Sequence, residues 1–213
     1  MNYLDIINKC LYEMNYKQVN DIAELTKTEH KRLLSAINTV NKEVCNIENW
    51  NFLLKRNTAE LPEETGEIDI PVSGKILHIF IDGEEYSFCE NLKPFLTVNN
   101  RNLHKYSILN DKLLFKPFKE NKQLDIIYYT KNCVIDENNQ EKEDFENAAD
   151  KSLIPMPFAE QVLVYGACLR VKGNPQYFKF SYWLSMYKEA LLNLKSKTSI
   201  SAQNSPEINL LRG

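Results

Sequence analysis

Five cysteines and three histidines are the residues of this chain that most readily do chemistry. The cysteines are widely spaced and odd in number; they are Cys10, Cys45, Cys89, Cys133 and Cys168. No two of them form the Cys-x-x-Cys pair of a zinc ribbon or a thioredoxin-type site. We therefore expect small buried thiols in a reducing cytoplasm. The histidines, at His30, His78 and His104, are equally scattered, so the sequence predicts no metal site.

Other residues with chemical potential also have structural interpretations. The acidic pairs Glu63-Glu64 and Glu84-Glu85 fall in predicted turns, where the usual role of a carboxylate is to carry solvated charge. The two carboxylates of a glycosidase are paired in space and not in sequence, so the sequence does not exclude such a pair. Tyr128-Tyr129 and Tyr182-Trp183 could stack bases, but such pairs more often pack in a core. No phosphate-binding glycine loop, nucleophile elbow or zinc-protease motif occurs. The sequence thus predicts no catalytic residue, no metal ligand and no cofactor.

Composition excludes further classes of function. The chain has 213 residues, 43% of them hydrophobic, which is enough for one large domain or two small ones. Its net charge of −3 comes without the basic stripe typical of proteins that bind duplex DNA. No apolar run approaches the roughly 20 residues that a membrane helix needs. The first residues, MNYLDIINK, do not resemble a secretory signal.

Helical periodicity occurs at both ends of the chain. Asn2–Met14 predicts a short amphipathic helix, and Asp21–Asn46 a long one that Asn20 or Asp21 would cap. The stripe of the long helix suits core packing or, alternatively, a neighbouring subunit; it consists of Ile22, Leu25, Leu33, Ile37, Val40, Val44 and Ile47. Two closing helices are predicted over Phe158–Val171 and Pro175–Lys195, with Pro175 in the first turn. The stripe of the last helix comprises Phe180, Trp183, Tyr187, Ala190, Leu191 and Leu194.

Between the predicted helices, apolar and polar residues alternate, so the hydrophobic pattern has a period of two. Alternation begins at Trp50-Asn-Phe52, and Gln123–Thr130 predicts another strand. Asp82-Gly83 and Asn110-Asp111 each predict a two-residue hairpin turn. The first register pairs Ile79 with Tyr86 and Leu77 with Phe88, and the second pairs Ile108 with Leu113 and Tyr106 with Phe115.

Together these patterns predict an α+β fold. A helical layer of two N-terminal and two C-terminal helices is interrupted in the chain by a mostly antiparallel β-sheet or small β-barrel. The expected segments are N-terminal helices (1–48), a β-rich region (49–131), an acidic surface loop or lid (132–157), C-terminal helices that complete the helical unit (158–195) and a polar C-terminal arm (196–213). The acidic segment shows no strong period.

The order of local motifs resembles the head–tail connector proteins of tailed bacteriophages, also called adaptors or tail tubular ring proteins. N-terminal helices lead to Trp50-Asn-Phe52 and a Leu61-Pro62 turn, and a strand then ends in Ile81-Asp82-Gly83. The remaining motifs are Tyr106-Ser-Ile108 with Leu113-Leu-Phe115-Lys-Pro117, then Leu124–Tyr129, Leu153-Ile-Pro155, and Leu163-Val-Tyr-Gly166-Ala167 before a long helix. The resemblance covers about Ile22 to Lys195. The acidic segment Ile135–Asp150 and the chain after Lys195 depart from it.

The resemblance implies a mechanical role without catalysis. Such proteins form a homo-oligomeric ring, matching the twelvefold portal, that extends the DNA channel and supports tail or nozzle proteins. DNA would pass without sequence-specific binding, as the mildly negative charge allows. No membrane is implied, and the expected location is the virion neck or tail, with the host cytoplasm during assembly. A neck stopper or tail terminator is the nearest alternative, and a virion-associated cell-wall hydrolase is a more distant one.

The C-terminal arm contains the only candidate binding residues that the sequence offers. Ser196–Gly213 is rich in Ser and Asn, so it cannot bury enough surface to fold alone. Near its end an apolar cluster lies next to a cation; these residues are Ile208, Leu210, Leu211 and Arg212. We expect this arm to be mobile in the free monomer and to become ordered against the portal or an adjacent subunit. A dispensable end is the alternative.

Overall fold

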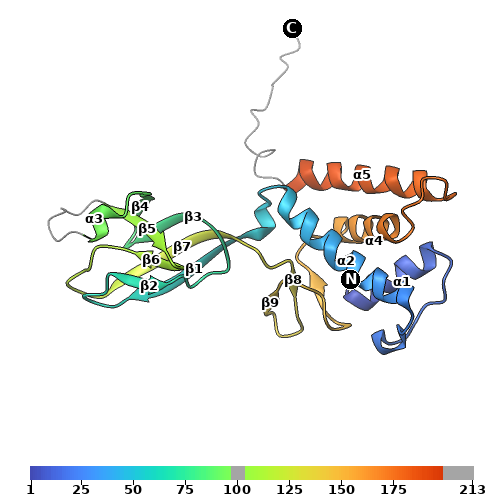
Figure 1. Ribbon diagram of the computed structural model, residues 1–213, viewed down its shortest axis with the longest axis horizontal. Coiled ribbons are helices and arrows are strands. Elements are labelled where there is room, and N and C mark those ends of the chain that lie inside the picture. Colours follow the sequence, from blue (N-terminus) through green and yellow to red (C-terminus); the bar gives the residue numbers. More distant parts are fainter. Residues whose placement is uncertain (97–103, 199–213) are drawn as a thin grey trace, which may run out of the picture. The chain divides into compact units, whose positions relative to one another are not determined.

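The computed structural model describes residues 1–96 and 104–198, and it has an α+β fold, as expected (Figure 1). The chain divides into two compact units. The helical unit comprises Met1–Leu53 and the chain from Lys131 onward, and the sheet unit comprises Leu54–Thr130. The sheet unit is therefore an insertion into the sequence of the helical unit.

Four long helices build the helical unit, and α4 lies at its centre. They are α1 (Tyr3–Glu13), α2 (Thr28–Ile47), α4 (Phe158–Val171) and α5 (Phe180–Thr198). Helix α4 packs against α1, α2 and α5, which is why most of its residues are apolar and several are small (Figure 1). Four residues of the predicted stripe, Leu33, Ile37, Val40 and Val44, are buried in α2, whereas Ile47 at its end is exposed. Ala36, Asn41 and Cys45, which lie off that stripe, are buried as well.

Of the two helices predicted near the N-terminus, the first is correct, and the predicted start of the second is wrong. Asp21 does cap a helical turn, since its side chain accepts a hydrogen bond from the amide of Ala23. That turn is only the 3₁₀ helix η1 (Ile22–Glu24), because the backbone of Leu25 leaves the helical region with ψ of 65°. Helix α2 begins afresh at Thr28 and has no side-chain cap.

The last helix also begins later than predicted. Pro175 does not start α5; it lies in a turn that is closed by a hydrogen bond from the Tyr177 amide to the Asn174 carbonyl oxygen, 2.9 Å long. Proline suits the second position of such a turn as well as it suits a first helical turn, so the sequence alone could not separate the two. The stripe of α5 is nevertheless oriented as expected, with Trp183, Ala190 and Leu194 buried.

Trp50 belongs to the helical unit, which corrects its expected place in a strand. Its ring is fully buried, and Nε1 donates a hydrogen bond of 2.7 Å to the carbonyl oxygen of Val44 near the end of α2. Residues Asn51–Leu53 form the 3₁₀ helix η2, and the first strand starts only at Leu54. The tryptophan thus satisfies a carbonyl that the end of α2 leaves open.

The sheet unit contains a curled sheet of seven strands and the short helix α3 (Lys93–Leu96). The spatial order is β1-β7-β3-β4-β5-β6-β2, and each pairing is antiparallel except that of β4 with β5. The strands are β1 (Leu54–Leu61), β2 (Glu67–Asp69), β3 (Gly74–Ile81), β4 (Glu84–Phe88), β5 (Lys105–Leu109), β6 (Lys112–Leu114) and β7 (Lys122–Thr130). Apolar side chains from these strands, including Ile79, Leu113 and Ile126, form its core.

Both predicted hairpin turns are present, and each register is correct next to its turn. Asp82-Gly83 and Asn110-Asp111 have positive φ at both central positions, as a type I′ turn requires. Ile79 pairs with Tyr86, and Ile108 with Leu113.

The outer pair of each predicted hairpin is wrong. In the pairing of β3 with β7, a register shift between Ile76 and His78 leaves Leu77 out of the ladder. Phe88 of β4 pairs with Tyr106 on β5 and not with Leu77. Strand β6 ends at Leu114, and the amide of Phe115 donates instead to Gly66, although the side chains of Tyr106 and Phe115 share the core.

The acidic segment 132–157 is not a simple loop or lid. It contains a three-stranded sheet of order β10-β8-β9, formed by β8 (Val134–Ile135), β9 (Glu141–Lys142) and β10 (Lys151–Ser152). Phe145 and Ile154 are buried in the helical unit, and the ring of Phe145 stacks on Tyr3 of α1 at 4.6 Å between centroids. Strands of two residues are too short to produce a readable period, so the pattern gave no sign of them.

Candidate interaction surfaces

The cysteines pack as apolar side chains. All five are free, four are buried as expected, and Cys89 is half-buried. In the contact between α1 and α4, Cys168 Sγ lies 3.8 Å from the carbonyl oxygen of Cys10. Burial, and then the hydrogen bond with Cys168, raises the pKa of the Cys10 thiol well above its usual value. A thiol held protonated in this way is a poor nucleophile.

The histidines lie apart from one another. His78 Nδ1 is 2.7 Å from Glu85 Oε1, and His104 Nε2 is 3.5 Å from Glu84 Oε2, both on the sheet unit. His30 belongs to α2. Within residues 1–96 and 104–198, no group of three His, Cys, Asp or Glu side chains is arranged to hold a metal ion.

Among the residues that the structure describes, four carboxyl groups have displaced pKa values, and all four are lowered; they are Asp82, Asp125, Glu143 and Asp150. The most enclosed of those on the sheet is Asp125, which accepts hydrogen bonds from Thr58 Oγ1 at 2.6 Å and Arg56 Nε at 3.2 Å. The bond from Arg56 is the main cause of its lowered pKa. These environments hold the carboxylates ionised, whereas the general acid of a glycosidase needs a raised pKa.

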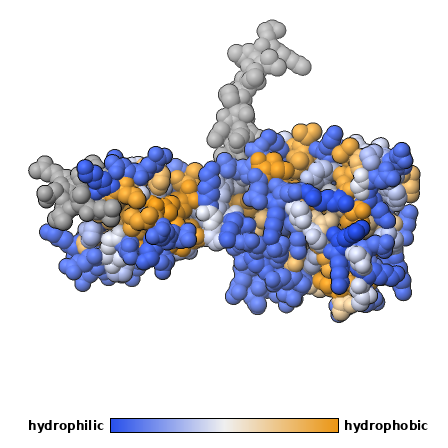
Figure 2. All heavy atoms as spheres, viewed as in Figure 1, coloured by the Kyte–Doolittle hydropathy of each residue, from blue (hydrophilic) through white to orange (hydrophobic). Residues whose placement is uncertain are grey.

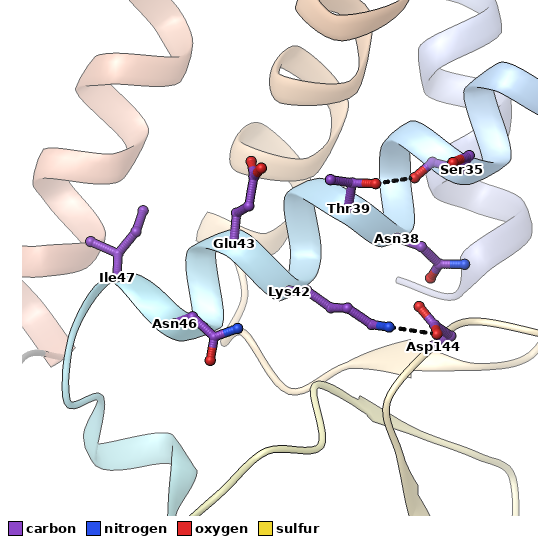
Figure 3. Close-up of a pocket in the computed structure, with 8 residues that line it drawn as sticks. All are labelled: Ser35, Asn38, Thr39, Lys42, Glu43, Asn46, Ile47 and Asp144. Carbon is purple, nitrogen blue, oxygen red and sulfur yellow. Dashed lines mark hydrogen bonds and ion pairs between the residues drawn. The ribbon is translucent and has the colours of Figure 1, made fainter.

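An open groove runs along α2, and most of its polar side chains already have partners. It encloses about 860 Å³ and is lined by Ser35, Asn38, Thr39, Lys42, Glu43, Asn46, Ile47 and Asp144. In Figure 3, Lys42 reaches toward Asp144, and the distance from Nζ to Oδ2 is 2.6 Å. Glu43, on another side of α2, pairs with Arg170. Ile47, 49% exposed, is the apolar side chain at one end.

A smaller groove lies between α1 and α4 and contains two aromatic rings. We call it the tyrosine groove; it encloses about 370 Å³ and is lined by Lys9, Tyr12, Glu13, Pro157, Glu160, Gln161, Val164 and Tyr165. Tyr12 is 70% exposed. The hydroxyl of Tyr165 lies 3.3 Å from that of Tyr182 on α5, with the rings edge to face, and burial raises its pKa. Two carboxylates lie beside the rings: Glu160 pairs with Lys9, and Glu13 accepts a hydrogen bond from Trp183 Nε1.

Exposed apolar side chains occur on both units. On the sheet unit they include Leu77, Phe88, Ile108 and Leu109, between 38% and 51% exposed. On the helical unit, Phe178 is 73% exposed and Leu192 on α5 is 68% exposed. Figure 2 shows such apolar surface over the strands and over the region of α5. Each unit therefore exposes apolar side chains of its own.

The predicted binding residues and the grooves come from different parts of the chain. Ile208, Leu210, Leu211 and Arg212 lie outside the described residues. Sequence reasoning missed the tyrosine groove. One signal was present: Tyr12 lies off the apolar stripe of its helix, which consists of Leu4, Ile7, Leu11 and Met14, so a large ring had to face outward.

Two further findings bear on the class of protein. Within the described residues, every helix is too short or too polar to cross a lipid bilayer. Known protein families and curated protein sequences were both compared with the chain, and neither comparison gives a match.

Proposed function

We propose that this chain is a structural virion protein, the head-to-tail adaptor whose ring binds below the portal of a tailed bacteriophage. The observation that carries the proposal is the two-unit architecture, with a sheet unit inserted into a helical unit and apolar side chains exposed on each. A ring is built from heterologous contacts, so every subunit needs two different surfaces that complement each other. Two units with separate apolar surfaces meet that requirement.

The order of elements supports the same role. The helices, the Asp-Gly hairpin, the long strand β7 and the closing pair α4 and α5 follow one another as the connector resemblance implies. The net charge of −3 suits a channel wall past which DNA must slide, because a basic wall would hold the phosphates. In this role the partners are the portal, tail or nozzle proteins and further copies of the chain.

The direct experiment measures assembly. Native mass spectrometry of the purified chain, alone and with portal rings, should reveal a closed oligomer whose copy number matches the portal. Electron microscopy of virions with a labelled copy of the chain should place the label in the neck. A label at the far end of the tail, together with a chain that stays monomeric beside portal rings, would contradict the proposal. A label one ring farther from the portal would favour a stopper or tail terminator.

A further inference from the structure

The tyrosine groove offers a chemically specific site for a short peptide. Tyr12, Pro157 and Tyr165 supply apolar and aromatic surface, and Glu13 and Glu160 supply carboxylates at the same groove, which Lys9 also lines. Tyrosine rings bind partners well because they present a large contact area at a small cost in conformational entropy. A groove of about 370 Å³ is at the small end of the range for binding pockets. It suits a few aliphatic side chains followed by a cation.

The chain itself contains a segment with that chemistry. Ile208, Leu210 and Leu211 are aliphatic, and Arg212 follows them directly. The carboxylates of the groove already have partners. Glu160 pairs with Lys9, and Glu13 Oε2 accepts a hydrogen bond from Trp183 Nε1 and lies 3.9 Å from Lys179. A guanidinium can still bind beside them, because a carboxylate has two oxygens and accepts several hydrogen bonds.

The reach of the arm favours a neighbouring copy. Helix α5 ends at Thr198, and about ten residues separate it from Ile208. Any stretch of ten residues spans at most about 33 Å, and a random coil of that length has a root-mean-square length of about 17 Å. Tyr182 on α5, whose hydroxyl lies 3.3 Å from that of Tyr165 in the groove, is about 24 Å along the helix axis from Thr198. Binding within one copy would need the arm to span more than its random-coil average, whereas the groove of an adjacent subunit in a ring need not impose that stretch.

We propose that residues Ile208–Arg212 of one copy bind the tyrosine groove of the adjacent copy. The aliphatic side chains contact Tyr12, Tyr165 and Pro157, and Arg212 binds Glu160 or Glu13. This inference rests on the proposed ring, in which the arm would link each subunit to the next. The arm would add affinity to the ring contact by raising the effective concentration of the neighbour.

Photo-crosslinking with isotope mixing tests the proposal. The full-length chain carries p-benzoylphenylalanine in place of Leu211, and equal amounts of unlabelled and ¹⁵N-labelled chain are mixed before irradiation. We expect crosslinked peptides that join the arm to Tyr3–Glu13 or Phe158–Val171, with mixed isotopes showing that the two peptides come from different copies. Tyr12→Ser should lower the crosslink yield roughly tenfold, as truncation of an aromatic hot spot does. Phe178→Ser, an equally exposed ring outside the groove, is the matched control.

Each contrary outcome separates this inference from the proposed function. Crosslinks within single copies only, or crosslinks to the sheet unit, overturn the groove proposal and leave the ring intact if native mass spectrometry still finds it. Equal yields from the parent chain and Tyr12→Ser overturn it as well. A chain that stays monomeric in the presence of portal rings and gives no mixed-isotope product overturns both proposals.

Discussion

The backbone of Gly166 in α4 lies against Val40 of α2, so that a β-carbon on Gly166 would come within 2.7 Å of Val40 Cγ1. On another side, the same β-carbon would lie 2.9 Å from Cε2 of Tyr187 on α5. Three helices thus meet at one position where no side chain fits. The close approach explains why α4 is rich in small residues at the centre of the helical unit.

Gly166→Ala should therefore destabilise the helical unit, even though alanine is the better helix former. Overpacking costs about 1–3 kcal/mol, and the helix propensity of alanine offsets up to about 1 kcal/mol. We expect a net loss that lowers the melting temperature by a few degrees. The control is Gly173→Ala, since a β-carbon there would meet its nearest atom at 3.5 Å. Equal melting temperatures for the two variants, measured by circular dichroism at 222 nm, would contradict this account.

Trp183 anchors α5 to the end of α1. Its side chain is fully buried, Nε1 donates a 3.0 Å hydrogen bond to Glu13 Oε2, and its ring stacks on Tyr177 with centroids 5.3 Å apart. Trp183→Ala should cost about 3–5 kcal/mol through lost burial and a cavity. Leu192→Ala, on the same helix but 68% exposed, should change stability by less than about 0.5 kcal/mol. A melting temperature of Trp183→Ala within a degree or two of the parent would show that this contact is not a core contact.

Local signals in the sequence predicted local structure well. The stripe of Asn2–Met14 gave α1 almost to the residue, and the ends of α4 agree with the prediction. The two hairpin turns could be predicted because both demand positive φ, which Asp-Gly and Asn-Asp tolerate. In each case neighbouring residues determine the outcome.

Features that depend on distant residues could not be predicted. The bulge at Leu77 arises where β3 pairs with β7, a strand far along the chain. Phe145 is buried because it meets Tyr3, which a pattern of acidic residues around it does not reveal. The tyrosine groove requires α1 and α4 to be neighbours, and periodicity does not say which helices meet. The fold class was therefore predictable, and the candidate site was not.

Asp150 should make the helical unit sensitive to acid. Its carboxylate is fully buried and accepts hydrogen bonds of 2.7 Å from the amides of Glu146 and Asn147, while Lys142 Nζ lies 2.8 Å away. Burial alone would raise its pKa, but the contact with Lys142 and the two amide bonds outweigh that effect and lower the pKa. Because the folded pKa lies below the unfolded value, the stabilisation is fully present above about pH 4 and is lost as the pH falls through the folded pKa.

Asp150→Asn should thus lower the free energy of unfolding at neutral pH by about 1.5–3 kcal/mol, and the difference from the parent should shrink in acid. The measurement is urea unfolding at a series of pH values from neutral to strongly acidic. Glu146→Gln is the matched control, because it also contacts Lys142 but its side chain is 69% exposed. A difference for Asp150→Asn that stays constant down to the lowest pH would refute the role assigned to its charge.

The cell-wall hydrolase interpretation predicts turnover, and the adaptor proposal predicts none. We expect the purified chain to leave the turbidity of bacterial cell walls unchanged and to release no phosphate from nucleotides. Among the described residues, the carboxylates that lie beside a histidine are Glu85, 2.7 Å from His78, and Glu84, 3.5 Å from His104. Robust lysis that Glu85→Gln or Glu84→Gln abolishes, with unchanged thermal melting, would end the adaptor proposal. Lysis that persists in both variants and does not co-elute with the chain would point to a contaminating enzyme.

The C-terminal arm should be needed for loading rather than for folding. A chain truncated after Lys197 loses the apolar cluster and Arg212 but keeps nearly all of α5, including the buried Leu194. We expect its melting temperature to stay within about 2 °C of the parent, since α5 is held by Trp183 and Ala190 as well. Its occupancy on portal-bearing heads, measured by quantitative gel analysis of purified particles, should fall sharply.

The full-length variant Leu210→Ser with Leu211→Ser should reproduce that fall, because it removes the aliphatic contacts and keeps the length of the arm. Exchange of Ser205 for Ala, which leaves the cluster intact, is the control and should load normally. Wild-type occupancy for the truncated chain would mean that the arm is dispensable, whereas normal folding with failed loading would make it part of the attachment mechanism.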